Sequence, residues 1–193
     1  MTGATATQPY TAEEYLALEV NAETRNEFHD GDIIAMTGGT PEHNEIIRMF
    51  IFLLTAALRK QPYCIFCSDQ RLWIPAANLY TYPDVMVTAK PPELKPGRKD
   101  TVMDPILLGE TLSKSTQNYD RGDKFAAYRT MKSVQEYVLI DQYRPQVEHY
   151  AKQSADQWLL TTYQGLDANF RLESVDVDIA LAELYEAVEF ADQ

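Results

Sequence analysis

Apolar residues recur along the chain at two spacings, one typical of helices and one typical of strands. Thr11, followed three residues later by Glu14, forms a capping-box pattern that predicts the start of a packing helix. A second helix is expected after Thr40 and Pro41, because a capping residue followed by proline favours a helix start. Apolar positions then continue at helical spacing over 46–58, in a stripe wide enough to pack on a sheet.

Runs of β-branched and aromatic residues predict the strands. Asp30 and Gly31 separate two apolar runs, and an Asp-Gly pair in that position indicates a hairpin. Other strands are expected at 63–68, 70–74, 82–87, 106–112 and 136–141, with a closing antiparallel pair at 147–151 and 158–163. Residues 75–80 are expected to form a turn, and residues 179–190 a terminal amphipathic helix.

A short helix is expected to follow the strand at 106–112. Asp120 is a suitable cap for it, and Lys124 and Tyr128 then lie one turn apart on one face. Lys124 can lay its aliphatic stem on the core and extend its ammonium group to the edge of the sheet.

Length and composition favour a single domain. The chain has 193 residues, of which 45% are apolar, which is enough for a substantial core. We expect one domain over 10–193, after a disordered polar tail over 1–9. No apolar run is long enough for a transmembrane helix, and the first residues lack the features of a secretory signal, so a cytoplasmic location without a membrane partner is expected.

The two cysteines, Cys64 and Cys67, have a C-x-x-C spacing. Residues three apart on a strand point to opposite faces, and no second pair is present to complete a zinc site. Two reduced structural thiols are therefore expected, which agrees with a reducing compartment.

The formal net charge of −12 counts against a general nucleic-acid coat protein, which needs a basic surface. It does not exclude a nuclease, because carboxylates that bind a metal ion are themselves acidic. The densest positive group lies in a proline-rich stretch that we interpret as a solvated surface loop rather than a phosphate contact: Lys90, Lys95, Arg98 and Lys99.

Two acids stand where half-buried strands normally carry apolar residues. Asp84 and Glu110 each interrupt an apolar run, and a buried carboxylate is costly unless it is paired or hydrogen-bonded. Two acids and Lys124 at one sheet edge could hold Mg²⁺ beside a phosphodiester, with the main-chain carbonyl of Thr111 as a further oxygen ligand. By spacing alone, this combination also arises often by chance.

Other chemistries have less support. The chain has no G-x-S-x-G elbow, no P-loop and no G-x-G-x-x-G pattern. His29, His43 and His149 lack metal-ligand spacing, and His43, in a first helical turn, is expected to make a local hydrogen bond rather than to contact substrate. From chemistry alone, Glu27 is expected to face solvent, paired with Arg25.

An ordered set of motifs resembles the Uma-two family, a bacterial group placed with restriction endonucleases in the PD-(D/E)XK nuclease superfamily. The motifs are RNEFHDGD at 25–32, GTPEHN at 39–44, YPDV at 82–85, ETLSKST at 110–116 and DRGDKFAAY at 120–128. The resemblance covers nearly the whole chain, from about Tyr10 to Phe190.

This resemblance implies an α/β (α+β) chain with a restriction-endonuclease-like fold, in which helices flank a mixed central β-sheet after an N-terminal helix and β-hairpin. It also implies catalytic roles for Glu27, Asp84, Glu110 and Lys124, with Asp84 and Glu110 as ligands of Mg²⁺ or Mn²⁺. Two departures stand out. Leu112 occupies the position where the superfamily carries its lysine, so that function would move to Lys124, and Thr111 stands where an apolar residue is usual.

Three functions are therefore open at this point. The first is a Mg²⁺-dependent DNA endonuclease, for which a homodimer would supply one site for each strand. The second is a catalytically silent nuclease-fold module that binds nucleic acid or other proteins, a reading that the acidic balance favours. The third is a metal-dependent hydrolase of small phosphoesters.

Overall fold

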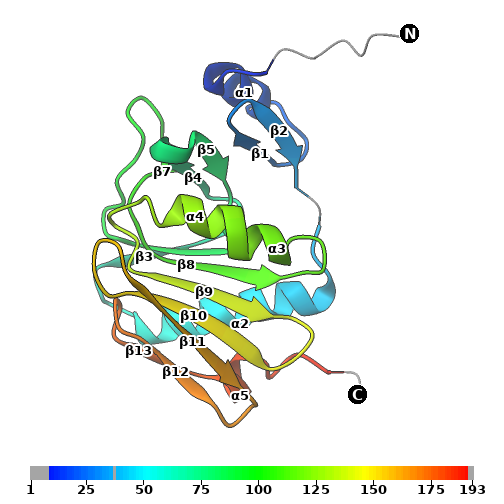
Figure 1. The fold of residues 1–193 in the computed structure, drawn as a ribbon, viewed down its shortest axis with the longest axis vertical. Coiled ribbons are helices and arrows are strands. Elements are labelled where there is room, and N and C mark those ends of the chain that lie inside the picture. Colours follow the sequence, from blue (N-terminus) through cyan, green and yellow to red (C-terminus); the bar gives the residue numbers. More distant parts are fainter. Residues whose placement is uncertain (1–8, 37, 191–193) are drawn as a thin grey trace.

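A six-stranded mixed sheet forms the centre of the molecule in the computed structural model, which describes residues 9–36 and 38–190 (Figure 1). Its strand order is β11-β10-β9-β8-β6-β3, with β8 and β9 parallel and the other neighbours antiparallel. The strands are β3 (Tyr63–Cys67), β6 (Val85–Ala89), β8 (Pro105–Leu112), β9 (Glu136–Asp141), β10 (Gln146–Lys152) and β11 (Trp158–Gln164). The predicted disordered tail lies, apart from residue 9, outside the described residues.

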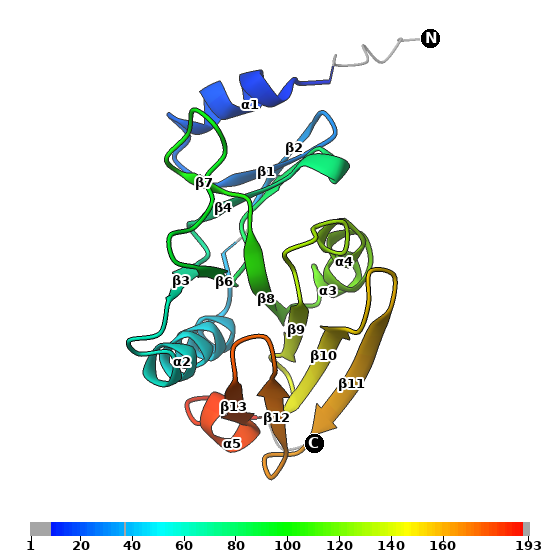
Figure 2. The ribbon, with the colours of Figure 1, turned by 90° about the vertical axis from the view of Figure 1, so that its left-hand side faces the viewer.

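Helices cover both faces of this sheet (Figure 2). The long helix α2 (Pro41–Ala57) lies on one face, where Phe50 and Leu54 pack with Val87 and Val138. A second helical segment lies on the other face and consists of α3 (Gln117–Tyr119), a π-helical turn η2 (Asp120–Lys124) and α4 (Phe125–Tyr128). Successive residues of each strand therefore alternate between two cores, as the period of a strand requires.

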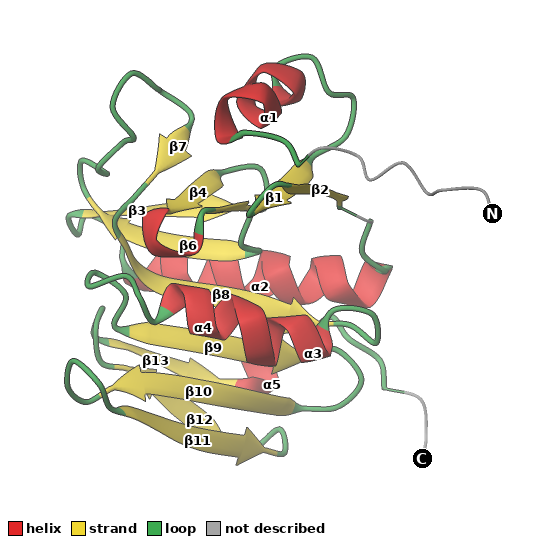
Figure 3. Ribbon diagram, turned by 45° about the horizontal axis from the view of Figure 1, so that its top comes forward, coloured by secondary structure: helices red, strands yellow, loops and turns green. Residues whose placement is uncertain are grey.

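A smaller, five-stranded sheet stands beside the first, with the order β2-β1-β5-β4-β7. Its strands are β1 (Asn26–His29), β2 (Asp32–Ala35), β4 (Arg71–Ile74), β5 (Leu79–Thr81) and β7 (Thr101–Val102), and a 3-10 turn η1 (Pro75–Ala77) joins β4 to β5. Helix α1 (Ala12–Glu19) lies beside this sheet (Figure 3). It packs on the sheet through Tyr15, which meets Phe28 and Tyr80.

The C-terminal part closes the core on the α2 side. Strands β12 (Asn169–Leu172) and β13 (Val177–Ala180) form a separate hairpin, and the short helix α5 (Leu181–Leu184) follows. Phe170, Ile179 and Leu184 pack in the same core as α2.

Several local predictions are confirmed. Thr11 and Glu14 form the capping box of α1, and Thr40 caps α2 ahead of Pro41. The turn between β1 and β2 has positive φ at Asp30 (47°) and Gly31 (104°), which is the twist that a two-residue hairpin needs. The α+β class with mixed sheets and flanking helices is confirmed as well, and both cysteines are free thiols.

Other predictions are wrong in detail. Strands β3 and β4 belong to different sheets, because the described strands form a five-stranded sheet and a two-stranded hairpin besides the central six-stranded sheet. Residues 79–81 form β5 within the expected turn. Residues 177–180 form β13, which leaves only α5 of the expected terminal helix.

The chain crosses from one sheet to the other at Tyr82-Pro83-Asp84. Strand β5 ends at Thr81 and β6 begins at Val85, so Asp84 precedes the strand in which it was expected. Pro83 has no N–H to donate to a ladder, which agrees with a break at this point. Asp84 thus lies between the two sheets.

Among the described residues, no helix is both long and apolar enough to cross a membrane.

Candidate active site

A cavity of about 550 Å³ lies between the two sheets and the helices, and all four predicted site residues line it. They come from four separate places: Glu27 from β1, Asp84 from the crossing between the sheets, Glu110 from β8 and Lys124 from η2. The structure therefore brings together residues that are far apart in the sequence.

Glu110 is a buried acid on the α4 face of the central sheet. It follows Leu108 on that face, is only 4% exposed, and accepts a hydrogen bond from the Tyr128 hydroxyl at 2.8 Å. Burial raises the pKa of Glu110 to about 8; the Lys124 ammonium opposes the shift, and the charge of Asp84 adds to it. This carboxylate is thus poorly stabilised in its charged form.

Lys124 is the cation at the centre of the acidic group. Its Nζ lies 3.0 Å from Glu110 Oε1, and 3.6 Å from both Glu27 Oε1 and Asp120 Oδ1. Burial alone would lower the pKa of Lys124, but the surrounding carboxylates outweigh burial and raise it. The ammonium group of Lys124 thus stays charged among three acids.

The π-helical turn η2 gives Lys124 this position. Asp120 and Lys124 are both buried there, and Tyr128 follows one turn later on the same face. Turns of this kind occur often at functional sites.

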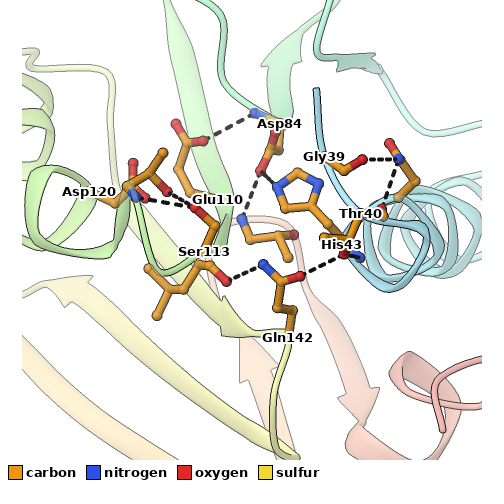
Figure 4. Close-up of polar contacts among 12 residues, drawn as sticks. Gly39, Thr40, His43, Asp84, Glu110, Ser113, Asp120 and Gln142 are labelled. Carbon is orange, nitrogen blue, oxygen red and sulfur yellow. Dashed lines mark hydrogen bonds and ion pairs between the residues drawn. The ribbon is translucent and has the colours of Figure 1, made fainter. Parts of the chain in front are cut away.

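Asp84 is held by a different set of groups. Its Oδ2 accepts the backbone N–H of Thr111 at 2.8 Å, and the Asp84 N–H points to Glu110 Oε2 at 3.4 Å. Figure 4 shows Asp84 between Glu110 and His43, whose Nε2 lies 3.4 Å from Asp84 Oδ2. The described contacts do not pair Asp84 directly with Lys124.

His43 is a site residue that the sequence pattern did not single out: its backbone N–H makes a local hydrogen bond to Thr40 at 3.2 Å, but its side chain meets Asp84. Burial would lower the pKa of His43, but Asp84 and the carbonyl of Thr111 raise it. Gly39 lies against the ring, since a Cβ at that position would come within 2.6 Å of His43 Nδ1. Only the GTPEHN motif could have signalled this contact.

Glu27 does not face solvent, although residue chemistry alone predicted that it would. It is buried and accepts a hydrogen bond from the Thr81 hydroxyl, while Arg25 pairs with Asp69 at 3.5 Å. The family resemblance placed Glu27 correctly beside the cavity. The residue pattern alone could not place Glu27 there. Strand β1 lies between β2 and β5 in the folded sheet, and the pairing with the distant β5 is not visible in the sequence.

Asp120 and Tyr119 are further cavity residues that were not predicted as such. Asp120 was expected to cap a helix, but helical structure begins earlier, at Gln117, and Asp120 instead faces Lys124. Burial raises the pKa of Asp120, and the charge of Lys124 counteracts the shift. The four-residue spacing from Asp120 to Lys124 is the signal that could have found it.

The donor set fits a hard divalent cation. Asp84 and Glu110 are joined through the Asp84 N–H, and the Thr111 carbonyl lies near the same place, close to His43. Among the described residues, no group of three or more His, Cys, Asp or Glu side chains is spaced to hold a metal ion. Mg²⁺ commonly uses one or two carboxylates and fills its other positions with water and substrate phosphate.

Comparisons with known proteins point to one family. The model of the Uma2 family, described as "Putative restriction endonuclease", matches residues 12–182. Two relatives from Synechocystis sp., both named only as uncharacterized proteins, are similar in sequence. One (sll1609) is 40% identical over 89% of this chain and 97% of its own length, and the other (slr1290) is 34% identical over 92% of each.

A solved structure shares the fold. The chain superposes on a protein from Anabaena variabilis, titled a "putative nuclease belonging to DUF820", with a TM-score of 0.75 over 92% of this chain and 98% of that chain. The sequences are 20% identical, so this likeness concerns the fold.

Proposed function

The chain belongs to the Uma2 family, and from that premise we propose that it is a Mg²⁺-dependent endonuclease that hydrolyses phosphodiester bonds of DNA. Mn²⁺ is expected to replace Mg²⁺, because both are bound by carboxylate and carbonyl oxygens. The catalytic residues of the proposal are Glu27, Asp84, Glu110 and Lys124.

The observation that supports this proposal best is an excess of buried negative charge. Four carboxylates line the cavity, those of Glu27, Asp84, Glu110 and Asp120, whereas Lys124 is the one buried cation beside them among the described residues. Buried charges normally occur in pairs, so the unbalanced acids favour a second cation as part of the working site.

The chain's own residues have distinct tasks in the proposed reaction. Asp84 and Glu110 would hold the metal ion, with the Thr111 carbonyl as a neutral oxygen ligand. When bound, the ion supplies activation of a water and neutralisation of charge on the phosphate. Burial and the charge of Glu110 raise the pKa of Tyr128, so the Tyr128 hydroxyl keeps its proton and can orient Glu110 by donating a hydrogen bond.

Lys124 would orient the attacking water and offset negative charge that develops on the phosphate. Its ammonium is fixed by the carboxylates of Glu27, Glu110 and Asp120, so it needs little rearrangement during the reaction. Glu27 is accordingly a residue that positions Lys124, in addition to lining the cavity.

Single-turnover cleavage of supercoiled plasmid DNA tests the proposal. We expect wild-type protein to nick or linearise the plasmid in Mg²⁺ or Mn²⁺ and not in EDTA. Asp84→Ala should be inactive. Asp123→Ala, which removes an exposed acid of η2, the segment that carries Lys124, should remain active. A folded wild-type protein that binds metal but leaves every nucleic acid intact would instead support a silent nuclease-fold module.

The size of the cavity favours a second candidate, a hydrolase of small phosphoesters. A volume of about 550 Å³ lies in the range of small-molecule sites. Hydrolysis of a chromogenic phosphodiester such as bis(p-nitrophenyl) phosphate separates the two. A small ester that is turned over faster than DNA would favour this candidate over the endonuclease.

A further inference from the structure

We propose that the cavity accepts one unpaired strand of nucleic acid at a time, with Tyr143 and Lys114 binding the nucleotide next to the reacting phosphodiester. This inference rests on the proposed function and names the substrate class of the same site. Tyr143 and Lys114 have a binding role rather than a catalytic one. Both line the cavity, but neither is buried beside the acids that would hold the reacting group.

Two unpaired polar atoms indicate that a ligand enters the cavity itself. Among the buried side-chain atoms that the structure describes, His43 Nδ1 and the Tyr119 hydroxyl have no hydrogen-bond partner. Both residues line the cavity. Buried polar groups are nearly always hydrogen-bonded, so two exceptions in the lining of one cavity favour a polar ligand whose binding shifts the lining and gives these atoms partners.

Positive charge at the cavity is too sparse to hold a duplex. Of the lysines and arginines that the structure describes, Lys114 and Lys124 line the cavity, and Lys124 is already surrounded by carboxylates. The basic loop at 90–99 lies elsewhere, with Arg98 paired to Asp100 at 2.6 Å. Proteins that bind duplex DNA commonly neutralise about 6–10 phosphates, and this site offers far fewer cations.

The rim offers an aromatic surface instead. Tyr143 is 46% exposed, which leaves much of its ring free for a nucleobase. Its hydroxyl accepts the backbone N–H of Lys114 at 3.2 Å, and the Lys114 ammonium lies 5.5 Å from the ring centroid. An aromatic ring with a neighbouring cation is the combination by which proteins bind unpaired strands, since every base can stack on it.

Another part of the cavity lining is apolar. It comes from the end of β2 and the residues after it, where Ile34 and Met36 line the cavity together with Ala35, and Ile34 is 46% exposed. A splayed base can rest on such a wall, whereas a base inside a duplex is stacked and paired and cannot. These features therefore favour a single strand, such as a locally unpaired segment of a supercoiled plasmid. One site then suffices for nicking, without the homodimer that cutting both strands would require.

Binding of fluorescein-labelled oligonucleotides, followed by anisotropy in Ca²⁺ to prevent turnover, tests this inference. The probes are a DNA single strand, an RNA strand of the same sequence, and a hairpin duplex that contains the same DNA strand. We expect the better of the two single strands to bind at least about tenfold more tightly than the duplex. The sugar that binds more tightly identifies the substrate as DNA or RNA.

Variants locate the binding to the rim. Tyr143→Ala should weaken single-strand binding about tenfold, Tyr143→Phe should bind like wild type, and Lys114→Ala should flatten the salt dependence by about 0.7 in slope. Tyr10→Ala is the matched control for the ring, because Tyr10 is 48% exposed and does not line the cavity. Lys152→Ala is the control for the cation, since Lys152 lies 5.8 Å from the Trp158 ring and away from the cavity.

Two results would overturn the inference: tighter binding of the duplex, or equal affinities of Tyr143→Ala and Tyr10→Ala for the single strand. A parallel titration of Mn²⁺ keeps this failure distinct from failure of the proposed function. If wild type binds Mn²⁺ at the site but prefers the duplex, only the single-strand inference fails. If wild type binds no Mn²⁺, the proposed endonuclease fails as well.

Discussion

Two buried glutamates on neighbouring strands of the central sheet have opposite surroundings. Glu110 of β8 is 4% exposed and faces α4, whereas Glu136 of β9 is 2% exposed and lies on the other face of the sheet, in register with Leu107. Burial is therefore nearly equal for the two. What differs is the set of groups that each carboxylate meets.

Glu136 is fully hydrogen-bonded by neutral donors and a histidine. It accepts from His149 Nε2 at 2.8 Å, from the backbone N–H of Glu173 at 3.0 Å and of Ser174 at 2.9 Å, and from the Ser174 hydroxyl. Burial would raise the pKa of Glu136, but these donors outweigh burial and lower it. This carboxylate fastens the loop between β12 and β13 to the sheet.

Glu110 meets Lys124 and Tyr128 but also other acids, and burial, to which the charge of Asp84 adds, raises its pKa to about 8. A carboxylate that serves only the fold can be satisfied locally, as Glu136 is. A buried carboxylate without enough cations or donors around it adds little to folding stability and remains available to bind a ligand. The groups that surround a buried acid, rather than its burial itself, therefore distinguish a structural site from a candidate active site.

The largest expected effect concerns the one cation beside Glu110. Lys124→Met keeps the apolar stem and deletes the charge, and should lower single-turnover plasmid cleavage by about two to four orders of magnitude. Lys124→Arg should rescue poorly, because a planar guanidinium does not replace a compact ammonium. Lys132→Met, at an exposed lysine, is the control, and equal rates for both methionine variants would remove Lys124 from the mechanism.

The next effect concerns Glu136. Glu136→Gln places an amide N–H₂ group among N–H and O–H donors, so the free energy of unfolding should fall by about 3 kcal/mol. Urea denaturation measures it. An unfolding free energy within error of wild type would show that Glu136 is no better satisfied than Glu110.

A smaller effect of opposite sign is expected for the matched change at Glu110. Without metal, Glu110→Gln relieves repulsion among the carboxylates and retains an acceptor for Tyr128 and Lys124. The unfolding free energy should rise by about 1 kcal/mol, which corresponds to roughly 2–4 °C in Tm. A clear loss of stability in EDTA would show that Glu110 is a structural partner of Lys124.

The smallest effect is a difference in pH dependence between the two glutamates. The folded pKa of Glu110 is raised, so its contribution to stability is present below the ordinary value of 4.5 and is lost as pH rises toward about 8. The folded pKa of Glu136 is lowered, so its contribution is present above 4.5 and is lost as pH falls below that value. In metal-free buffer, the gain from Glu110→Gln should therefore grow across the range from 4.5 to about 8. A gain that stays constant with pH would contradict the raised pKa of Glu110.

Sequence patterns predicted much of the fold because the signals were local. The capping box at Thr11, the Asp30-Gly31 turn and the helix start at Thr40 depend on residues within one turn of each other. The terminal hairpin was missed for the opposite reason, since the apolar residues of β13 and α5 together imitate one amphipathic helix.

The candidate site was predictable only in part. Asp84 and Glu110 stood out because each interrupts an apolar run, but neither spacing nor periodicity could show that Glu27 and Lys124 meet at 3.6 Å. That contact joins β1 of the smaller sheet to η2 beside the central sheet, which is a property of the tertiary fold. His43 was misjudged for the same reason, because its side chain meets the distant Asp84 rather than a local partner. Asp120 was misjudged for a local reason: helical structure begins before it, so it faces Lys124 one turn later instead of capping the helix.

The excess carboxylates at Asp84 and Glu110 are proposed to form a binding site for a divalent cation. Isothermal titration of Mn²⁺ into metal-free wild type, Asp84→Ala and Asp123→Ala tests it most directly. We predict a single class of site in wild type and in Asp123→Ala, and loss of that site in Asp84→Ala with the fold retained by circular dichroism. The same Mn²⁺ isotherm for wild type and Asp84→Ala, or no binding to either, would contradict the claim.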